Sequence, residues 1–241
     1  SGGGARALSR PPPLPMEEVG AAVVDLSALE YLDPSTADGH RVVYDRELQL
    51  EMRLEQSEGV VAESGPLEPL RVKLLVLGEE ECPAGVRIEC TSENDLFFHY
   101  THTVDEAGFL GIQEQQGLTI DFIDYVPVLI RMLNDCISSP TTTLGLFVLQ
   151  RGGQAHLDFI QNLEYKFVEL LSVSLIESDE DIIRKSITHR YQCVKSRLAI
   201  VQTRLTDFTA LVKIKNPSLV MQMYRAGSPS NNSAFGRTLS R

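Results

Sequence analysis

Several features are missing from this 241-residue chain, and each absence excludes a class of protein. No apolar run approaches the roughly 20 residues that span a bilayer, so we expect no membrane partner. A net charge of −11 argues against a phosphate-binding surface, so we expect no nucleic-acid partner. The four cysteines lie far apart without a CxxC pair, which favours reduced thiols in the cytoplasm. The N-terminus lacks the apolar segment of a secretory signal, and its first residue, Ser1, is compatible with a fragment.

Motifs for catalysis and cofactor binding are also missing from the sequence. It contains no P-loop, dinucleotide fingerprint, GxSxG, HExxH or EF-hand pattern, and Gly152-Gly153 is only a turn signal. His99 and His102 are three apart in a predicted strand, which places them on opposite faces and predicts packed or surface histidines. Nothing in the sequence places a base beside Cys136. We therefore expect no enzyme, no cofactor and no metal site.

The stretch from Leu157 to Leu175, LDFIQNLEYKFVELLSVSL, is predicted to be a hairpin. Apolar residues alternate with polar ones on both sides of a polar break, as in two half-buried strands joined by a turn. The turn carries Tyr165, a large aromatic side chain. A loop-tip aromatic on a rigid hairpin is a candidate anchor for a partner's pocket, and the alternative is that Tyr165 folds back onto its own core.

Other strands and two helices are predicted around this hairpin. Period-two alternation or β-branched content predicts strands at 41–56, 70–78, 86–93, 95–104 and 144–151. A short helix follows Asp105 as cap and ends at Gly117, and a second runs over about 121–137 with Asp121 or Asp124 as cap and Pro127 in its first turn. The order of elements predicts an α+β fold, an antiparallel β-sandwich or barrel head with an inserted helix–turn–helix pair.

The last regular segment, 178–216, is predicted to be a helix that forms a short parallel coiled coil. Ser178 followed by Asp181 resembles a capping box, and Asn216-Pro217 ends the helix. Apolar residues step by four and three over more than three heptads, which is typical of a coiled-coil seam. Valine at one heptad position with leucine at the other favours a parallel dimer. The seam residues are Ile187, Tyr191, Val194, Leu198, Val201, Leu205, Phe208 and Val212.

These elements divide the chain into four parts. We expect a disordered N-terminal arm over 1–40, a head domain over 41–177, the coiled-coil helix over 178–216 and a disordered tail over 217–241. The arm contains a short apolar patch, Val19 to Leu32, which could be a partner-binding peptide but fits a weakly packed segment better.

About two-thirds of the chain, from Leu48 to Leu205, resembles the N-terminal part of the spindle assembly abnormal protein six family, the centriolar cartwheel protein. The most specific segments are SENDLFFHYTHTV (92–104), FLGIQEQQGLTIDFIDYVPVLIRMLNDCI (109–137) and the predicted hairpin. No single motif carries the match, but order, spacing and several runs of consecutive residues agree. In that family a Gln-Gln-Gly-Leu segment, here Gln115 to Leu118, leads into an Asp-Phe pair, here Asp121 and Phe122.

The resemblance implies a self-assembling scaffold. In the family, heads pair by inserting a hairpin-loop residue, usually Phe or Ile followed by Lys, into a pocket of the neighbouring head, and stalks pair as coiled coils. Alternation of the two contacts gives the ninefold cartwheel hub of the centriole or basal body. On this resemblance the head–head interface would comprise Tyr165, Lys166, Phe167, Glu164, Gln115, Gln116, Leu118 and Phe122. The chain itself, and other centriolar or basal-body proteins, are the expected partners.

Two departures leave alternatives open. The tip residue is Tyr instead of Phe or Ile, and the heptad run is short, whereas cartwheel proteins carry a long one. These features also fit a short cartwheel-like paralogue at the flagellar base or in the apical cytoskeleton. A further alternative is a DNA-repair scaffold with the same head and stalk, although the acidic composition opposes it. The last alternative is an adaptor that binds one partner peptide.

Overall fold

The computed structural model describes residues 33–57, 60–61, 64–79, 82–215 and 218. Two predicted parts lie largely outside these residues: the N-terminal arm, including the whole of Val19 to Leu32, and the C-terminal tail. The chain forms two compact units: one includes the head and α4 up to Lys195, and the other includes α4 from Ser196 onward. Each unit is described by itself.

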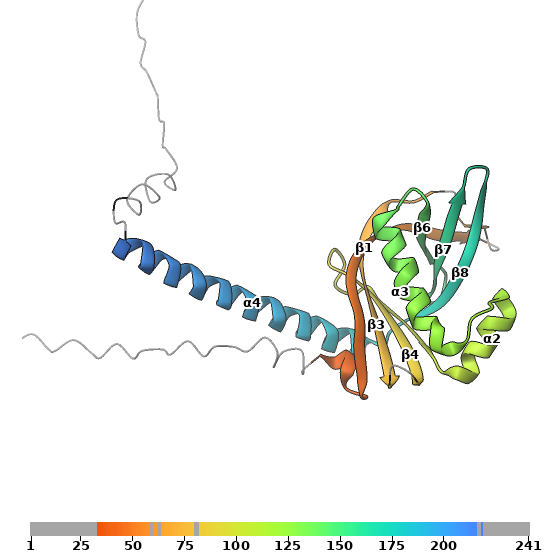
Figure 1. Ribbon diagram of the computed structural model, residues 1–241, viewed down its shortest axis with the longest axis horizontal. Helices are drawn as coiled ribbons and strands as arrows, with labels where there is room; N and C mark the ends of the chain where they lie inside the picture. The colour runs from red at the N-terminus through yellow and green to blue at the C-terminus, as the bar shows by residue number, and fades with distance from the viewer. Residues whose placement is uncertain (1–32, 58–59, 62–63, 80–81, 216–217, 219–241) are drawn as a thin grey trace, which may run out of the picture. The chain divides into compact units, whose positions relative to one another are not determined.

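The head is a β-barrel with two helices inserted into its strand order (Figure 1). A short 3₁₀ turn, η1 (Pro34–Thr36), precedes the strands and helices of the head. These are β1 (His40–Ser57), β2 (Val60–Val61), β3 (Leu67–Gly78), β4 (Pro83–Ser92), β5 (His99–Val104), α2 (Glu106–Gln116), α3 (Phe122–Ser138), β6 (Thr143–Leu149), β7 (Gln154–Leu163) and β8 (Lys166–Glu177). The stalk helix is α4 (Glu180–Lys215). The predicted α+β class is confirmed.

The strands follow the order β2-β1-β3-β4-β5-β8-β7-β6, and each neighbouring pair in this order is antiparallel. The ring closes through a parallel pair, in which Glu51 to Leu54 of β1 lie opposite Leu146 to Leu149 of β6. Closure removes the exposed edge that an open sheet would present. Within the closed ring the shortest pairing is between β5 and β8, where two residue pairs are in register, Tyr100 with Glu177 and Thr101 with Ile176.

The core forms where the inward residues of the strands meet the apolar stripe of α3. Leu157 and Phe159 of β7 and Leu171, Val173 and Leu175 of β8 are all buried, as their alternation predicts. From α3 the buried residues are Phe122, Tyr125, Val126, Leu129, Leu133 and Cys136, which recur at helical spacing. The hairpin β7–β8 is therefore anchored in the core along most of its length.

The first residues that the structure describes are tied to the outside of the barrel. Lys73 of β3 donates to the Asp33 carboxylate at 2.7 Å, and the Ser35 hydroxyl donates to the buried Glu89 carboxylate at 2.6 Å. Burial of Glu89 raises the pKa of its carboxyl above the usual value, although Ser35 and Lys73 act in the opposite direction. Residues 33–36, part of the predicted arm, are thus ordered against β3 and β4.

Three local predictions are wrong. The strand predicted over 95–104 begins only at His99, because Ser92 and Asp95 side chains accept backbone N–H groups of residues 94, 95 and 97 and hold a turn there. Pro127 lies beyond the first turn of α3, which begins at Phe122. Ser178 does not cap α4: its hydroxyl lies 2.9 Å from His99 Nδ1, and the Asp179 carbonyl accepts the first helical bonds.

Candidate assembly surfaces

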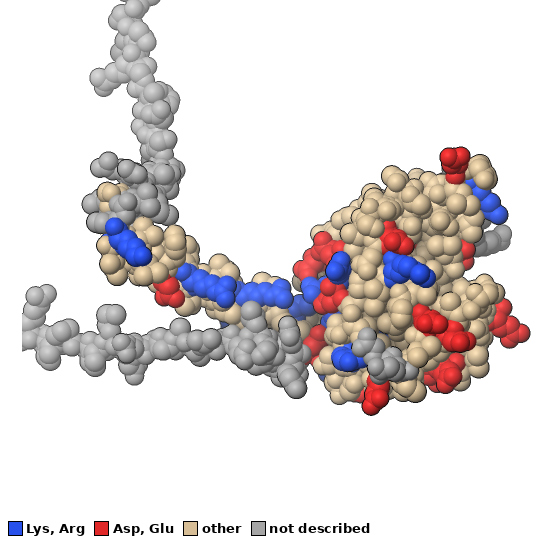
Figure 2. Space-filling model, viewed as in Figure 1, with Lys and Arg blue, Asp and Glu red and all other residues tan. Residues whose placement is uncertain are grey.

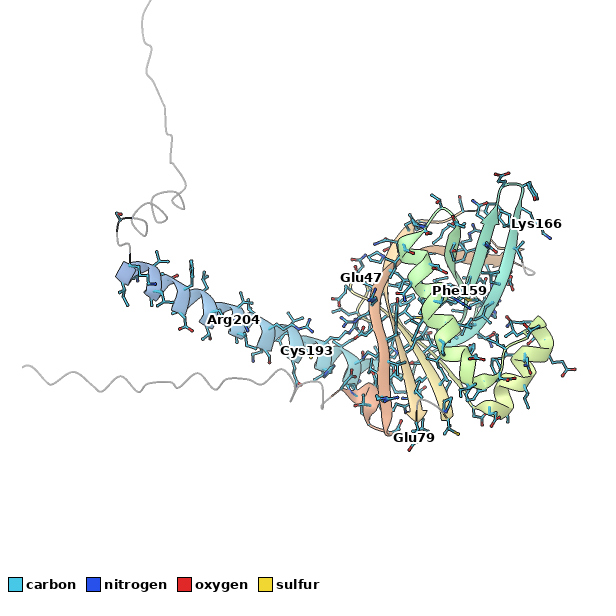
Figure 3. The ribbon with its side chains drawn as sticks, in the orientation of Figure 1. Glu47, Glu79, Phe159, Lys166, Cys193 and Arg204 are labelled. Atoms are coloured by element: carbon cyan, nitrogen blue, oxygen red, sulfur yellow. The ribbon has the colours of Figure 1, made fainter. Side chains whose placement is uncertain are left out.

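The tip of the β7–β8 hairpin is an exposed apolar surface on a rigid support. Leu163 pairs with Lys166, so only Glu164 and Tyr165 form the turn. The Tyr165 side chain is 89% exposed and Phe167 is 63% exposed. Figure 3 shows Lys166 at the far end of the hairpin, while Phe159 of the same hairpin lies inside the head. Tyr165 therefore does not fold back onto its own core, and the structure gathers Glu164 to Phe167 in one place.

The other predicted head–head residues have different positions. Gln115 is exposed, Leu118 is half-buried against the core, and Phe122 is buried at 7% exposure. The Gln116 side chain bonds the backbone of Ser172 twice: its Nε2 donates to the carbonyl at 2.7 Å, and its Oε1 accepts from the N–H at 2.9 Å. This amide occupies the hydrogen-bonding groups of β8 that β5 does not reach.

A pocket of about 350 Å³ lies where the insert meets the turn between β3 and β4. Apolar side chains form much of its wall, and the Phe109 and Phe122 rings pack at 5.5 Å between centroids. Carboxylates and an amide also line it. The lining residues are Cys82, Pro83, Glu106, Phe109, Leu110, Gln113, Asp121, Phe122 and Ile123. Of these, only Phe122 is among the predicted interface residues, because the pocket joins segments that are far apart in the chain.

The predicted seam of α4 is an exposed apolar stripe. Tyr191, Val194, Leu198, Val201, Leu205 and Phe208 are each between 55% and 67% exposed in the single chain. Ile187 and Val212 at the two ends of the stripe are half-buried. Exposing this much apolar surface on a lone helix is unfavourable, because full burial of each such side chain contributes roughly 1.5–3 kcal/mol of free energy. The stripe is a candidate helix-pairing surface.

The phase of the 3–4 steps decides which seam residues occupy heptad positions a and d, and these positions influence how many helices associate. A step of three leads from heptad position a to d, so Leu198 and Leu205 occupy a, whereas Val194 and Val201 occupy d. The arrangement typical of dimers is the reverse, with the β-branched residue at a and leucine at d. The residue types at a and d therefore do not by themselves select two helices over three or four.

The root of α4 is fixed to the head. Arg190 donates to the carbonyl oxygens of Ser92 and Leu96, both at 2.9 Å, and Ile183 is buried. The His99–Ser178 contact lies at the same junction. Burial, together with the positive charges of Arg190 and Lys73, lowers the pKa of His99 to about 4, so the ring is neutral at physiological pH.

Among the described residues, the side chains that could serve catalysis or bind a metal do not form a cluster. Within the part of the chain that the structure describes, no three His, Cys, Asp or Glu side chains gather to hold a metal ion. His99 and His102 bond different partners, the Ser178 hydroxyl and the Ser174 carbonyl. Burial raises the pKa of the Cys136 thiol to about 11, which disfavours the nucleophilic thiolate. No helix among the described residues is long and apolar enough to cross a membrane.

Comparison with known proteins points to one family. A family model for the centriolar protein SAS N-terminal domain matches residues 42–175. The spindle assembly abnormal protein 6 homologue of Gallus gallus is 24% identical over 162 residues, which cover 62% of this chain and 25% of the homologue. The Mus musculus homologue is 25% identical over 144 residues, 56% of this chain and 22% of the homologue. This chain thus spans about a quarter of the length of these relatives.

Solved structures share the fold. An N-terminal fragment of Leishmania SAS-6 that contains part of its coiled coil domain has a TM-score of 0.59 and 17% identity, covering 72% of this chain and 98% of the fragment. An N-terminal fragment of Drosophila melanogaster Sas-6, described as dimerised via its coiled-coil domain, has a TM-score of 0.61 and 12% identity, covering 80% and 92%. Both combine a head with a stalk.

Proposed function

Because the chain belongs to the family of the centriolar protein SAS N-terminal domain, we propose that it is a structural scaffold subunit that assembles with copies of itself. The observation that carries this proposal is that one chain exposes two separate apolar surfaces, the Tyr165 tip and the α4 seam. Each surface rests on a rigid element, and neither is covered by another described segment. Their role is to pair copies, not to perform chemistry.

The α4 seam is proposed to pair two chains as a parallel coiled coil. Pairing would remove Leu198, Val201 and Leu205 from water, together with their neighbours along the stripe. The Drosophila fragment is described as dimerised via its coiled-coil domain, and a C. elegans fragment as an N-terminal coiled-coil dimer. These descriptions support a coiled coil of two helices, whereas the residue types at positions a and d of this chain do not determine that number by themselves.

The Tyr165 tip is proposed to insert into the pocket beside Phe109 and Phe122 of a neighbouring head. Because a twofold interface is reciprocal, each head would supply one tip and one pocket. A buried tyrosine requires a hydrogen-bond partner for its hydroxyl. The carboxylates of Glu106 and Asp121 line the same pocket and can accept that bond. The pocket therefore suits tyrosine as well as the Phe or Ile expected at this position.

Two independent twofold contacts on one chain, used alternately, generate a closed ring or a helix. We propose that the product is the hub of a cartwheel at the centriole or basal body, the site that the family resemblance implies. The second candidate is a short cartwheel-like protein at the flagellar base or in the apical cytoskeleton. It is favoured by the tyrosine tip and by Asn216-Pro217, which directly follows α4.

Electron microscopy of the purified chain tests the scaffold. We expect rings or short helical arcs that become more abundant as protein concentration rises, and globular particles of one size at every concentration would contradict the proposal. Localisation of the tagged protein then separates the two candidates. A signal inside the centriole or basal-body hub supports the cartwheel, and a signal confined to another flagellar or apical structure supports the second candidate.

A further inference from the structure

The charges of this chain are strongly segregated. Residues 33–183 carry 28 Asp and Glu side chains against nine Lys and Arg. The rest of α4, Arg184–Lys215, carries eight Lys and Arg against one acidic residue, Asp207, which is a net charge of +7. In Figure 2, Lys and Arg side chains follow α4, while Asp and Glu are spread over the head. The chain therefore combines an overall net charge of −11 with a basic stalk.

Part of this positive charge forms a row beside the seam. Arg190, Arg197 and Arg204 recur every seven residues at heptad position g, and Leu211 continues the row. Arg190 is engaged by the head carbonyls. Arg197 and Arg204 are exposed, and among the described residues neither has an ion pair; Figure 3 labels Arg204 on α4. The two guanidinium groups start from Cα positions about 10 Å apart along the helix.

A second copy of the helix does not neutralise this row. In a parallel pair, position g faces position e of the partner helix, and the e residues here are Lys195, Gln202 and Thr209. None of them is a carboxylate, so pairing two stalks brings the basic rows closer without an opposite charge. This step rests on the proposed function, because it assumes that the stalk is a parallel dimer.

The distal end of α4 adds an apolar component outside the seam. Leu211 is 56% exposed and Ile214 is 80% exposed, and Lys213 and Lys215 alternate with them. Phosphates of a nucleic acid could pair with the arginines but would leave these aliphatic side chains in water, and the net charge of −11 on the whole chain opposes them. A polypeptide that presents both carboxylates and apolar side chains can satisfy both.

We propose that the row Arg197–Arg204–Leu211, with Ile214, is a docking surface for an acidic amphipathic segment of another protein. The segment would lie along the outside of the paired stalk, with carboxylates against the two arginines and apolar side chains against Leu211 and Ile214. The stalk would then serve both to pair heads and to recruit a second component of the assembly.

The test is fluorescence anisotropy of the full chain with a labelled peptide of four Glu-Leu-Glu-Ala repeats. We expect saturable binding that weakens as ionic strength rises. The double variant Arg197→Glu with Arg204→Glu should weaken binding by about tenfold or more. The matched control, Arg131→Glu with Lys185→Glu, changes the charge equally on exposed sites away from the row and should retain binding within about twofold.

The proposal would be overturned by no binding to the wild-type chain, by equal loss in both double variants, or by tighter binding of a short DNA duplex than of the peptide. Sedimentation in the absence of peptide reports separately on the stalk dimer. A monomeric stalk would refute the proposed pairing, whereas a dimer that ignores the peptide refutes only the docking surface. A complex of one chain with one peptide would mean that the peptide replaces the second stalk, which also contradicts the proposal.

Discussion

Gln116 performs with a side chain what a neighbouring strand would do with its backbone. Its amide both donates to and accepts from Ser172 at the part of β8 that β5 does not reach. Replacing Gln116 with alanine would leave both backbone groups without their partner, at a cost of about 1–3 kcal/mol in the free energy of unfolding. Gln115 is exposed, so Gln115→Ala should change the free energy of unfolding by less than about 0.5 kcal/mol.

Urea denaturation of the two variants measures this difference. If Gln116→Ala is as stable as Gln115→Ala, the two hydrogen bonds to Ser172 do not stabilise the barrel. The place of Gln116 in the head–head interface, which the family resemblance implies, then becomes the better account. The structure thus separates two neighbouring glutamines that the sequence motif treats alike.

His99 should make the stability of the protein depend on pH. In the folded state its pKa is lowered to about 4, chiefly by burial, while an unfolded histidine binds a proton near pH 6.5. Between these values the unfolded chain binds more protons, so the free energy of unfolding falls as the pH falls from 6.5 to 4, by up to about 3 kcal/mol. Above pH 6.5 this contribution is fully present.

Denaturation of the wild-type chain and of His99→Gln across this pH interval tests the assignment. The variant should lose most of the slope, because glutamine does not titrate. Parallel curves for the two proteins would show that His99 binds protons equally well in both states. The expected consequence is that acid loosens the junction between β5 and the start of α4, where Ser178 contacts His99.

At the scale of elements, substitutions in the α4 seam test directly whether two stalks pair. Leu198→Glu with Leu205→Glu places carboxylates at two neighbouring a positions of the seam, so the paired stalk should dissociate. Thr203→Glu with Ala210→Glu adds the same charge at exposed f positions, opposite the seam, and should leave pairing intact. Sedimentation velocity measures the mass of both variants, and a stalk dimer that survives the leucine substitutions would contradict the coiled coil.

Local periodicity was sufficient to predict elements whose pattern is contained in one segment. The β7–β8 hairpin, α2 with Asp105 and Gly117 at its ends, and the extent of β1 and α4 agree with their predicted bounds. Asp105 accepts from the Gly108 N–H at 2.8 Å, and Gly117 has a φ of 64°. These features depend on residues close together in the chain.

Features that join distant segments could not be predicted in the same way. The parallel β1–β6 pair closes the barrel across about 95 residues of chain, and no local pattern encodes its register. The pocket combines the β3–β4 turn with both inserted helices, so Phe109 and Leu110 gave no separate signal. The position of the Ser178 hydroxyl could not be predicted from the helix-start pattern, because it bonds a buried histidine that is distant in sequence, His99.

At the scale of the whole molecule, we expect the two proposed surfaces to act independently. The seam lies on α4, and the tip is a turn of the barrel hairpin, so a change at one should leave contacts at the other intact. A chain with both surfaces polymerises, a chain with one surface stops at a dimer, and a chain with neither is a monomer. Concentration should therefore drive growth only in the wild-type chain.

The most direct test of this claim is sedimentation velocity of the wild-type chain beside Tyr165→Glu. We expect the wild type to form species larger than the stalk dimer as its concentration rises, whereas Tyr165→Glu should remain a dimer. Tyr165→Phe, which keeps the ring and removes the hydroxyl, should still form the larger species. If Tyr165→Glu gives the same mass distribution as the wild type at every concentration, the hairpin tip does not pair heads, and the central claim is wrong.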